Sequence, residues 1–389
     1  MHYDSIIVGA GFAGAVTARC LAEAGRHVLI LEKHNHIGGN AYDRLDEAGI
    51  LIHQYGPHIF HTNDKAVYDF LSRFTQWRTY QHEVVANIPA EEGRAEMPVP
   101  FNLLSLRQAY APEKAARLEK KLMETYGPEQ KVTILQLREN TDPELSELAQ
   151  YVYDHVFVRY TMKQWGQKPE EIDPAVTARV PVFISEDCRY FQDVYQGMPL
   201  HGYTPLFEAM LTHEGIEVRT ETDARDMLTL KDGKIFFDGA EFSGDVIYSG
   251  PVDELFSCCF GRLPYRTLDF RFETHAQDTY QSHGTVNYTM DEDYTRITEF
   301  KYLTGQEKPG VTTIVKEYSR AYTGAADEIP YYAIANEETA ALYAQYAAKA
   351  AAFPRLHLLG RLAEYRYYNM DAIVAGALKL SRALVNGTC

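Results

Sequence analysis

Residues 5–14 read SIIVGAGFAG, and this stretch decides the fold class. Residues 5–8 form an apolar run typical of a buried strand, and the glycines that follow have the spacing G-x-G-x-x-G. Helical periodicity then extends from Ala15 to Ala24, and a second apolar run, residues 27–31, ends at Glu32. A strand, a glycine turn, a helix and a second strand in this order predict a dinucleotide-binding βαβ unit.

Each glycine of the motif has a physical reason. Gly9 permits the tight turn, Gly11 lets the backbone approach a pyrophosphate, and Gly14 lets the helix pack closely on the sheet. The helix N-terminus then faces the phosphates. Glu32, at the tip of the second strand, is predicted to accept a hydrogen bond from a ribose hydroxyl. The alternative, a chance glycine turn, explains neither the flanking elements nor Glu32.

A second glycine pair favours FAD over NAD. Glu32-Lys33 is followed by Gly38-Gly39-Asn40, which resembles the GG motif that lies beside the phosphates and ribityl chain in large flavoproteins. Gly360-Arg361 and residues 369–377 resemble the closing FAD segment of the same class. No second G-x-G-x-x-G occurs, so we expect no built-in NAD(P)H domain and an external reductant such as NAD(P)H.

Composition limits the other function classes. The chain has 389 residues, enough for two or three domains, and a formal net charge of -16, which argues against binding nucleic acid or anionic lipid. It has no apolar stretch long enough to cross a bilayer and no basic segment before the first strand, so we expect no membrane insertion and a cytoplasmic location. The five cysteines form no CxxC pair and no zinc-like cluster, so no metal site is predicted.

The patterning divides the chain into three parts. Residues 113–122 are rich in Lys and Glu with helical spacing, whereas residues 284–289 and 311–318 alternate as in antiparallel strands. We therefore predict an α/β protein with a Rossmann-like FAD-binding domain, an inserted helical domain and a mainly antiparallel β-sheet domain. The predicted ranges are 1–86, 206–255 and 340–389 for the FAD domain, 101–180 for the helical domain, and 87–100, 181–205 and 256–339 for the sheet domain.

Six further motifs carry a resemblance to a known family. They are YGPHIFHT (55–62), YTMKQWG (160–166), YFQD (190–193), YTRITE (294–299), IPYY (329–332) and YRYYNM (365–370). In this order they make the chain resemble the bacterial UDP-galactopyranose mutases over essentially its whole length. The resemblance implies an isomerase that interconverts UDP-galactopyranose and UDP-galactofuranose for galactofuranose-containing cell-surface glycans, and a homodimer or larger homo-oligomer.

The resemblance also implies a redox-neutral mechanism. Reduced FAD attacks the anomeric carbon of galactose through N5, UDP leaves and later returns, and the opened sugar recloses as a five-membered ring. Net redox change is zero, which agrees with an FAD module that has no NAD(P)H module beside it.

Site residues follow from the same motifs. Arg179 and Arg296 match the pyrophosphate-facing arginines, whose charge-assisted hydrogen bonds would stabilise the leaving UDP, and His61 matches a residue near the isoalloxazine. In several relatives the position of Asn369 is acidic, so a mechanism that requires a carboxylate there is not supported. The matched substrate-binding residues are Tyr160 and Trp165 at the uridine, Tyr190 and Phe191 nearby, Tyr332 or Tyr331 and Tyr367 at the phosphates, and Asn87, Arg266, Asn287 and Asn369.

The predicted cofactor site joins the N- and C-terminal segments to the 55–62 loop. It comprises Gly9, Gly11, Phe12, Gly14, Glu32, Lys33, Gly38, Gly39, Asn40, His58, Ile59, Arg361, Met370 and Ile373.

One segment of the helical part is a candidate lid. Residues 168–180 are polar, contain two prolines and include Arg179, so their closure could deliver this arginine to the substrate; a plain surface loop is the alternative.

The sequence is also compatible with two other functions. An amine-oxidase-type flavin oxidoreductase would share the FAD segments but would oxidise its substrate stoichiometrically. A non-enzymatic carrier on the same fold, as in GDP-dissociation inhibitors, would lack the flavin and be colourless.

Overall fold

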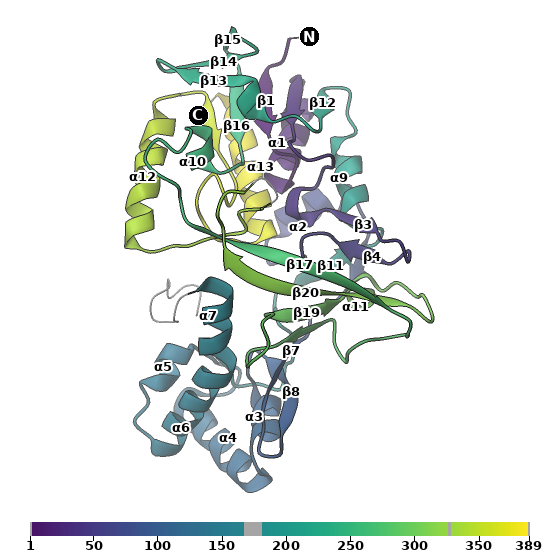
Figure 1. The fold of residues 1–389 in the computed structure, drawn as a ribbon, viewed down its shortest axis with the longest axis vertical. Helices are drawn as coiled ribbons and strands as arrows, with labels where there is room; N and C mark the ends of the chain where they lie inside the picture. The colour runs from purple at the N-terminus through teal and green to yellow at the C-terminus, as the bar shows by residue number, and fades with distance from the viewer. Residues whose placement is uncertain (1, 167–180, 326–327, 388–389) are drawn as a thin grey trace.

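The computed structural model describes residues 2–166, 181–325 and 328–387. Both chain ends lie in the upper part of the molecule, the long strands β17 (Tyr265–His275) and β20 (Thr312–Ala321) cross its middle, and a group of helices forms its lower end (Figure 1). These parts agree with the fold class predicted from the sequence.

The upper part is built on a five-stranded parallel sheet. Its order is β12 (Ile216–Arg219), β2 (Val28–Leu31), β1 (Ser5–Val8), β16 (Asp245–Tyr248) and β22 (Leu356–Leu358). In chain order this is 3-2-1-4-5, so the direction of winding reverses between β1 and β16. Ligands of open parallel sheets bind at such a switch point, beyond the carboxyl ends of the strands.

Helices cover both faces of this sheet because successive strand residues point to opposite sides. Ile7 packs on one face with α1 (Phe12–Glu23), α9 (Tyr203–Leu211) and α13 (Met370–Asn386), and Ile6 packs on the other with α12 (Glu337–Ala351). Both isoleucines are 0% exposed, and burial of each contributes about 1.5–3 kcal/mol.

The central sheet has seven strands and is antiparallel except between β18 and β7, which run parallel. Strand β7 begins at Val84, slightly before the domain boundary predicted after residue 86, because residues 84–86 already pair with β18. The order is β21 (Tyr332–Ala333), β17, β20, β19 (Arg296–Glu299), β18 (Thr285–Asn287), β7 (Val84–Pro89) and β8 (Arg94–Val99).

The lower part is helical, as the spacing predicts. Asp142 accepts hydrogen bonds from the backbone N–H groups of Glu144 and Leu145 and so caps a helix whose first residue is Pro143. The helices are α3 (Leu103–Ala109), α4 (Pro112–Tyr126), α5 (Ile134–Arg138), α6 (Pro143–Val152), a π-helical segment (Tyr153–Val158) and α7 (Arg159–Trp165).

Residues 181–205 differ from their predicted place in the antiparallel sheet domain. β10 (Val182–Phe183) pairs with β9 (Lys131–Val132), and β11 (Tyr195–Pro199) pairs with β5 (Phe60–Thr62) and β6 (Trp77–Thr79). The segment therefore joins the helical part to strands β5 and β6 and contributes no described strand to the seven-stranded sheet.

The remaining elements are short. They are α2 (Lys65–Leu71), α10 (Val252–Leu255), α11 (Phe300–Thr304), the hairpin β3 (Asp43–Leu45) and β4 (Leu51–His53), and the three-stranded sheet β13 (Leu228–Lys231), β14 (Lys234–Phe237) and β15 (Ala240–Phe242).

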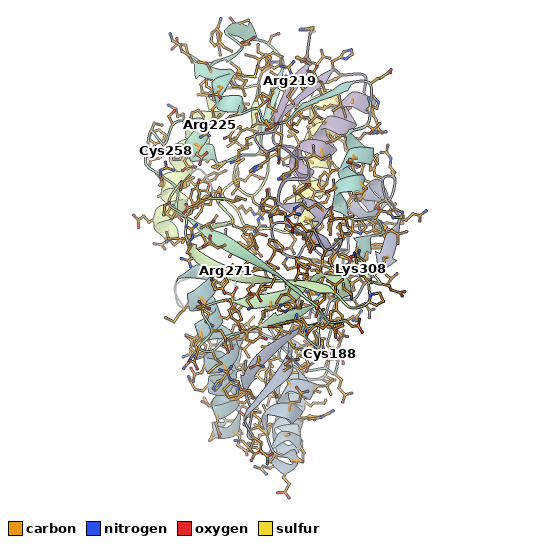
Figure 2. All side chains as sticks on the ribbon, turned by 45° about the vertical axis from the view of Figure 1, so that its right-hand side comes forward. Cys188, Arg219, Arg225, Cys258, Arg271 and Lys308 are labelled. Carbon is orange, nitrogen blue, oxygen red and sulfur yellow. The ribbon has the colours of Figure 1, made fainter. Side chains whose placement is uncertain are left out.

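Cys188 and Cys258 lie in different parts of the molecule (Figure 2), and the cysteines within the described residues are free thiols. None of the helices in the described ranges is long and apolar enough to span a bilayer.

Candidate functional site

Two glycine loops meet at the carboxyl end of β1. The Gly38 N–H donates a hydrogen bond to the Ala10 carbonyl at 3.0 Å. Gly39 has a φ of +54°, and a Cβ there would lie 3.1 Å from the Cα of Gly11. A side chain at Gly39 would therefore push the two loops apart, which explains the need for glycine at this position of the second motif.

The start of α1 is packed as closely. A Cβ on Gly14 would lie 1.9 Å from the Gly9 carbonyl oxygen, well inside contact distance. The cap residue Gly11 offers no side-chain hydrogen bond to the first turn of the helix. The N–H groups and positive dipole end of α1 therefore face the loop without a side-chain acceptor, as an anionic pyrophosphate requires.

Glu32 is fixed at the end of β2. Its side chain is almost completely buried, and its two oxygens accept hydrogen bonds from the backbone N–H groups of Ala10 at 2.8 Å and His34 at 2.9 Å. Each carboxylate oxygen has a further lone pair, so the group can still accept from a ribose hydroxyl.

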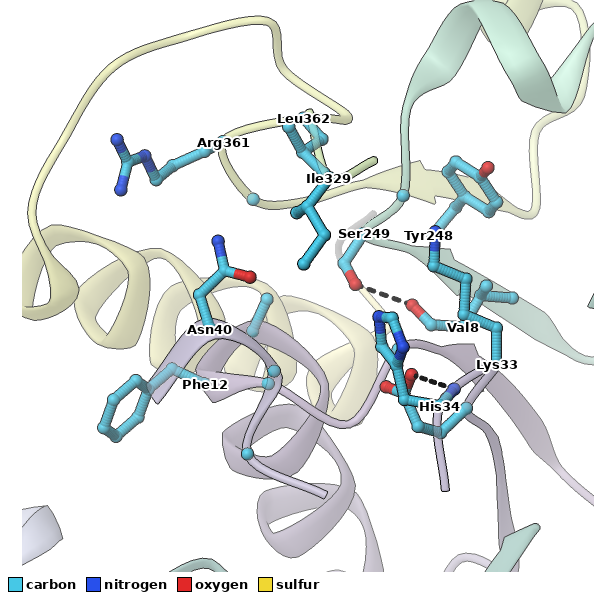
Figure 3. Close-up of a pocket in the computed structure, with 18 of the residues that line it drawn as sticks. Val8, Phe12, Lys33, His34, Asn40, Tyr248, Ser249, Ile329, Arg361 and Leu362 are labelled. Carbon is cyan, nitrogen blue, oxygen red and sulfur yellow. Dashed lines mark hydrogen bonds between the residues drawn. The ribbon is translucent and has the colours of Figure 1, made fainter. Parts of the chain in front are cut away.

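These loops line a cavity that we call the glycine cavity, which encloses about 1290 Å³ up to its open mouth. Arg361 and Asn40 lie at one end and Lys33 and His34 at the other (Figure 3). Its size and its glycine floor fit a dinucleotide. The predicted cofactor residues that line it are Gly9, Gly11, Phe12, Glu32, Lys33, Gly38, Gly39, Asn40, His58, Arg361, Met370 and Ile373.

A second cavity, the tyrosine cavity, lies between the central sheet, α7 and residues 57–61 and has a volume of about 1780 Å³ including its open mouth. His58, Arg361 and Met370 line both cavities, so the two meet at these residues. The predicted residues that the structure brings together here are Arg296, His61, Ile59, Tyr160, Tyr190, Phe191, Asn287, Tyr331, Tyr332, Tyr367 and Asn369.

Three polar residues lie side by side on adjacent strands of the central sheet. In the register of the sheet, Asn287 lies opposite Arg296, and Arg296 lies opposite Glu317. Arg296 and Glu317 form an ion pair with an Nε to Oε1 distance of 2.7 Å, although the two groups are not aligned as a hydrogen bond. The Glu317 side chain is 0% exposed and that of Arg296 is 21% exposed. Burial disfavours the charge of Arg296, but the Glu317 carboxylate together with Tyr160 and Tyr332 outweighs this effect and raises the pKa of Arg296.

Tyrosines surround Arg361. Its guanidinium carbon lies 4.5 Å from the ring centre of Tyr367 and 5.4 Å from that of Tyr332. Tyr331 uses its hydroxyl to donate to the Tyr55 carbonyl at 2.8 Å. Burial raises the pKa values of Tyr331 and Tyr332, so both phenols stay protonated.

Two cavity histidines are kept neutral. Burial lowers the pKa of His58 to about 3 and that of His82 to about 3, so both rings are uncharged at neutral pH. His58 also contacts the Gly56 carbonyl through Nδ1 at 2.9 Å. Neither histidine therefore titrates near neutral pH.

Several buried polar atoms in the two cavities have no hydrogen-bond partner among the described residues. Native proteins rarely bury such atoms unless a ligand or a water molecule forms a hydrogen bond with them. The lining side-chain atoms concerned are Gln164 Oε1, Asn287 Oδ1, Thr285 Oγ1 and Arg361 Nη2. Since acceptors and a cationic donor both occur, the arrangement suits a ligand with both hydroxyl or N–H groups and anionic oxygens.

Two predicted ligand residues lie elsewhere. Arg266 caps the end of α7, because its guanidinium donates to the carbonyls of Gln164 at 3.1 Å and Lys163 at 3.2 Å. Val84 lines the tyrosine cavity, and Asn87, three residues later in β7, has its side chain on the opposite face of the strand. There Asn87 Oδ1 accepts a hydrogen bond from Arg94 at 3.3 Å. Among the described residues, neither of these two lines the glycine cavity or the tyrosine cavity.

Other predicted residues have different places. Gly14 packs α1 against the turn and does not line a cavity, and Ile59 lines the tyrosine cavity but not the glycine cavity. Arg179 and the proposed lid at 168–180 lie outside the described residues. Trp165 ends α7, and its side chain is likewise outside the description.

Sequence reasoning missed Glu317, His82 and Gln164 in or beside the tyrosine cavity. Strand parity does not single out Glu317, because residues of both parities in β20, such as Ile314 and Val315, are buried. The short segment around His82 has no distinguishing pattern either.

Comparison with known proteins identifies the relatives. A family model described as UDP-galactopyranose mutase matches residues 155–367, and one described as an NAD(P)-binding Rossmann-like domain matches residues 7–74. The UDP-galactopyranose mutase of Mycoplasma pneumoniae is 35% identical, over 98% of this chain and 96% of the relative. The dTDP-fucopyranose mutase of Escherichia coli is 34% identical, over 98% of both chains.

The fold comparison agrees. A crystal structure of reduced UDP-galactopyranose mutase matches with a TM-score of 0.70 at 15% identity, covering 99% of this chain and 94% of that one. The amine-oxidase and carrier alternatives are set aside by full-length relatives that are named as mutases, which are isomerases. The chain therefore belongs to the UDP-galactopyranose mutase family.

Proposed function

We propose that this protein interconverts UDP-galactopyranose and UDP-galactofuranose without net redox change, with FAD in the glycine cavity. The observation that carries the proposal is the meeting of the two cavities at His58, Arg361 and Met370. A cofactor in the glycine cavity and a nucleotide sugar in the tyrosine cavity would touch there. When bound, reduced FAD supplies the nucleophile that this sugar chemistry needs.

The pyrophosphate end would be held by cations and phenols. Arg296 is pre-positioned by Glu317, and Arg361 presents a buried Nη2 that has no hydrogen-bond partner among the described residues. The phosphate-contacting tyrosine would be Tyr332 or Tyr331, since both line the tyrosine cavity. Together these groups would stabilise UDP as it leaves and returns. The family resemblance adds Arg179 as a second pyrophosphate arginine.

The uridine would lie toward the helical part. Tyr160, Val156 and Phe157 line this side of the tyrosine cavity, and Gln164 Oε1 and Asn287 Oδ1 are buried acceptors there. Stacking on an aromatic ring and hydrogen bonds from N–H or hydroxyl groups would orient the nucleotide and exclude water from the sugar. The proposal includes an external reductant, since the sequence has one dinucleotide motif.

The substrate test compares two nucleotide sugars. Dithionite-reduced protein is incubated with UDP-galactofuranose or with dTDP-fucofuranose, and the products are separated by chromatography. We expect UDP-galactopyranose to form with a kcat/KM at least about tenfold above that for the dTDP sugar, a difference of about 1.4 kcal/mol in transition-state binding. No product from either sugar, with flavin bound, would overturn the proposal, and a preference for the dTDP sugar would reassign the substrate.

A further inference from the structure

A directed chain of hydrogen bonds leads from the backbone of Val194 to the tyrosine cavity. The Val194 N–H donates to Asn63 Oδ1 at 2.9 Å. Because a backbone N–H can only donate, this contact fixes which end of the Asn63 amide is oxygen. The Asn63 nitrogen then donates to Asp193 Oδ1 at 2.6 Å.

Asp193 connects Asn63 to His61 and determines which nitrogen of His61 carries the proton. The other carboxylate oxygen, Asp193 Oδ2, lies 2.8 Å from His61 Nδ1. Hydrogen bonding to His61 holds the pKa of Asp193 below its usual range despite partial burial, so the carboxylate is an acceptor and Nδ1 carries the proton. Phe191 stacks on the His61 ring with 3.5 Å between ring centres, which fixes the plane of the imidazole.

The second nitrogen of His61 reaches Asn369 in the tyrosine cavity. His61 Nε2 lies 3.3 Å from Asn369 Nδ2. With the proton on Nδ1, a neutral imidazole has its lone pair on Nε2 and accepts from this amide nitrogen. Asn63 and Asp193 do not line the tyrosine cavity; they line a small polar pocket on the other side of Tyr190 and Phe191.

We propose that Asn63 and Asp193 are positioning residues that fix His61 as the Nδ1–H tautomer and thereby orient the Asn369 amide. The nitrogen of Asn369 faces His61, and its oxygen therefore faces away from His61. The opposite tautomer would set two donors, His61 Nε2–H and Asn369 Nδ2, against each other and turn the amide over. The role in catalysis rests on the proposed mutase function, whereas the tautomer itself does not.

Asp193→Asn is the direct test, because Asn63 dictates how the new amide is oriented. The single oxygen of the new side chain would accept from Asn63, so its nitrogen would face His61 Nδ1 and force the proton onto Nε2. Nitrogen-15 NMR of histidine-labelled protein reads the tautomer, with the His61 signal identified by its loss in His61→Gln. We expect Nδ1–H in the wild type, Nε2–H in Asp193→Asn, and a kcat lower by roughly 10- to 100-fold with little change in KM.

A double variant separates positioning from general damage. In Asn63→Ala/Asp193→Asn the new amide is free to turn its oxygen toward His61, so the Nδ1–H tautomer and part of kcat should return. A merely structural role predicts that the double variant is worse than the single one. Asp187→Asn is the matched control, since Asp187 pairs with Arg189 at 2.7 Å and lines neither cavity; it should change neither the tautomer nor kcat.

Two results would overturn the inference. One is a wild-type His61 protonated on Nε2, and the other is an unchanged tautomer in Asp193→Asn. Both are read in the holoprotein without substrate. An inactive protein with the expected tautomers would instead count against the proposed function alone.

Discussion

Arg296→Ala is expected to lower kcat/KM for the nucleotide sugar by at least about 10²- to 10³-fold, because it removes a cation that would stabilise the leaving pyrophosphate. The same change leaves Glu317, which is 0% exposed, as a buried charge without its partner. Breaking such a pair costs roughly 3–5 kcal/mol of unfolding free energy. Steady-state kinetics and denaturant unfolding measure the two effects separately.

A double variant tests whether the two losses have different causes. In Arg296→Met/Glu317→Gln no buried charge remains, so most of the stability should return while activity stays low. Lys316→Met is the control on the neighbouring residue of β20, because its pair with Glu273 at 2.8 Å is partly exposed and should cost at most about 1 kcal/mol. An active Arg296→Ala protein would contradict the assignment of Arg296 to the pyrophosphate.

Gly14→Ala is expected to give a protein that purifies without flavin. The added Cβ would lie 1.9 Å from the Gly9 carbonyl oxygen, and neither atom can move without its backbone, so α1 must move away from the turn. Its N-terminus would then no longer reach a pyrophosphate. The flavin absorbance per mole of protein should fall to near zero, and overpacking should lower the unfolding free energy by about 1–3 kcal/mol.

Gly376→Ala is the matched control for that change. Gly376 lies inside α13, and a Cβ there meets the end of the flexible Leu359 side chain at 3.2 Å. The variant should keep its flavin and be as stable as the wild type or up to about 1 kcal/mol more stable. Stoichiometric flavin in Gly14→Ala would contradict the close packing described here.

The βαβ unit could be predicted because its information is local. The strand, the glycine spacing, the helix and Glu32 all fall within the first 32 residues, and the structure places them as the spacing requires. The strand order could not be predicted in this way, since β1 pairs with β16, which lies more than 200 residues away in the chain. Such pairing depends on tertiary packing and leaves no local pattern.

The sequence motifs predict a site residue correctly only where the fold also points its side chain into the cavity. Tyr160, Arg296 and Asn369 converge on one cavity. Asn87 and Arg266 do not line it. The side chain of Asn87 lies on the opposite face of β7, and Arg266 donates hydrogen bonds to carbonyls at the end of α7. Glu317 belongs to a strand that was recognised, but its role depends on register with Arg296 across two strands. Register is a property of the assembled sheet and not of either segment.

In the proposed reaction the protein isomerises a nucleotide sugar with the help of its flavin and without net redox change. The most direct measurement follows the flavin spectrum and the product together, anaerobically, after one reductive titration with dithionite and addition of UDP-galactofuranose. We expect many equivalents of UDP-galactopyranose per flavin, a flavin that stays reduced throughout, and no product from the oxidised protein. Reoxidation of one flavin per sugar consumed, or equal activity of the oxidised protein, would contradict the proposed reaction.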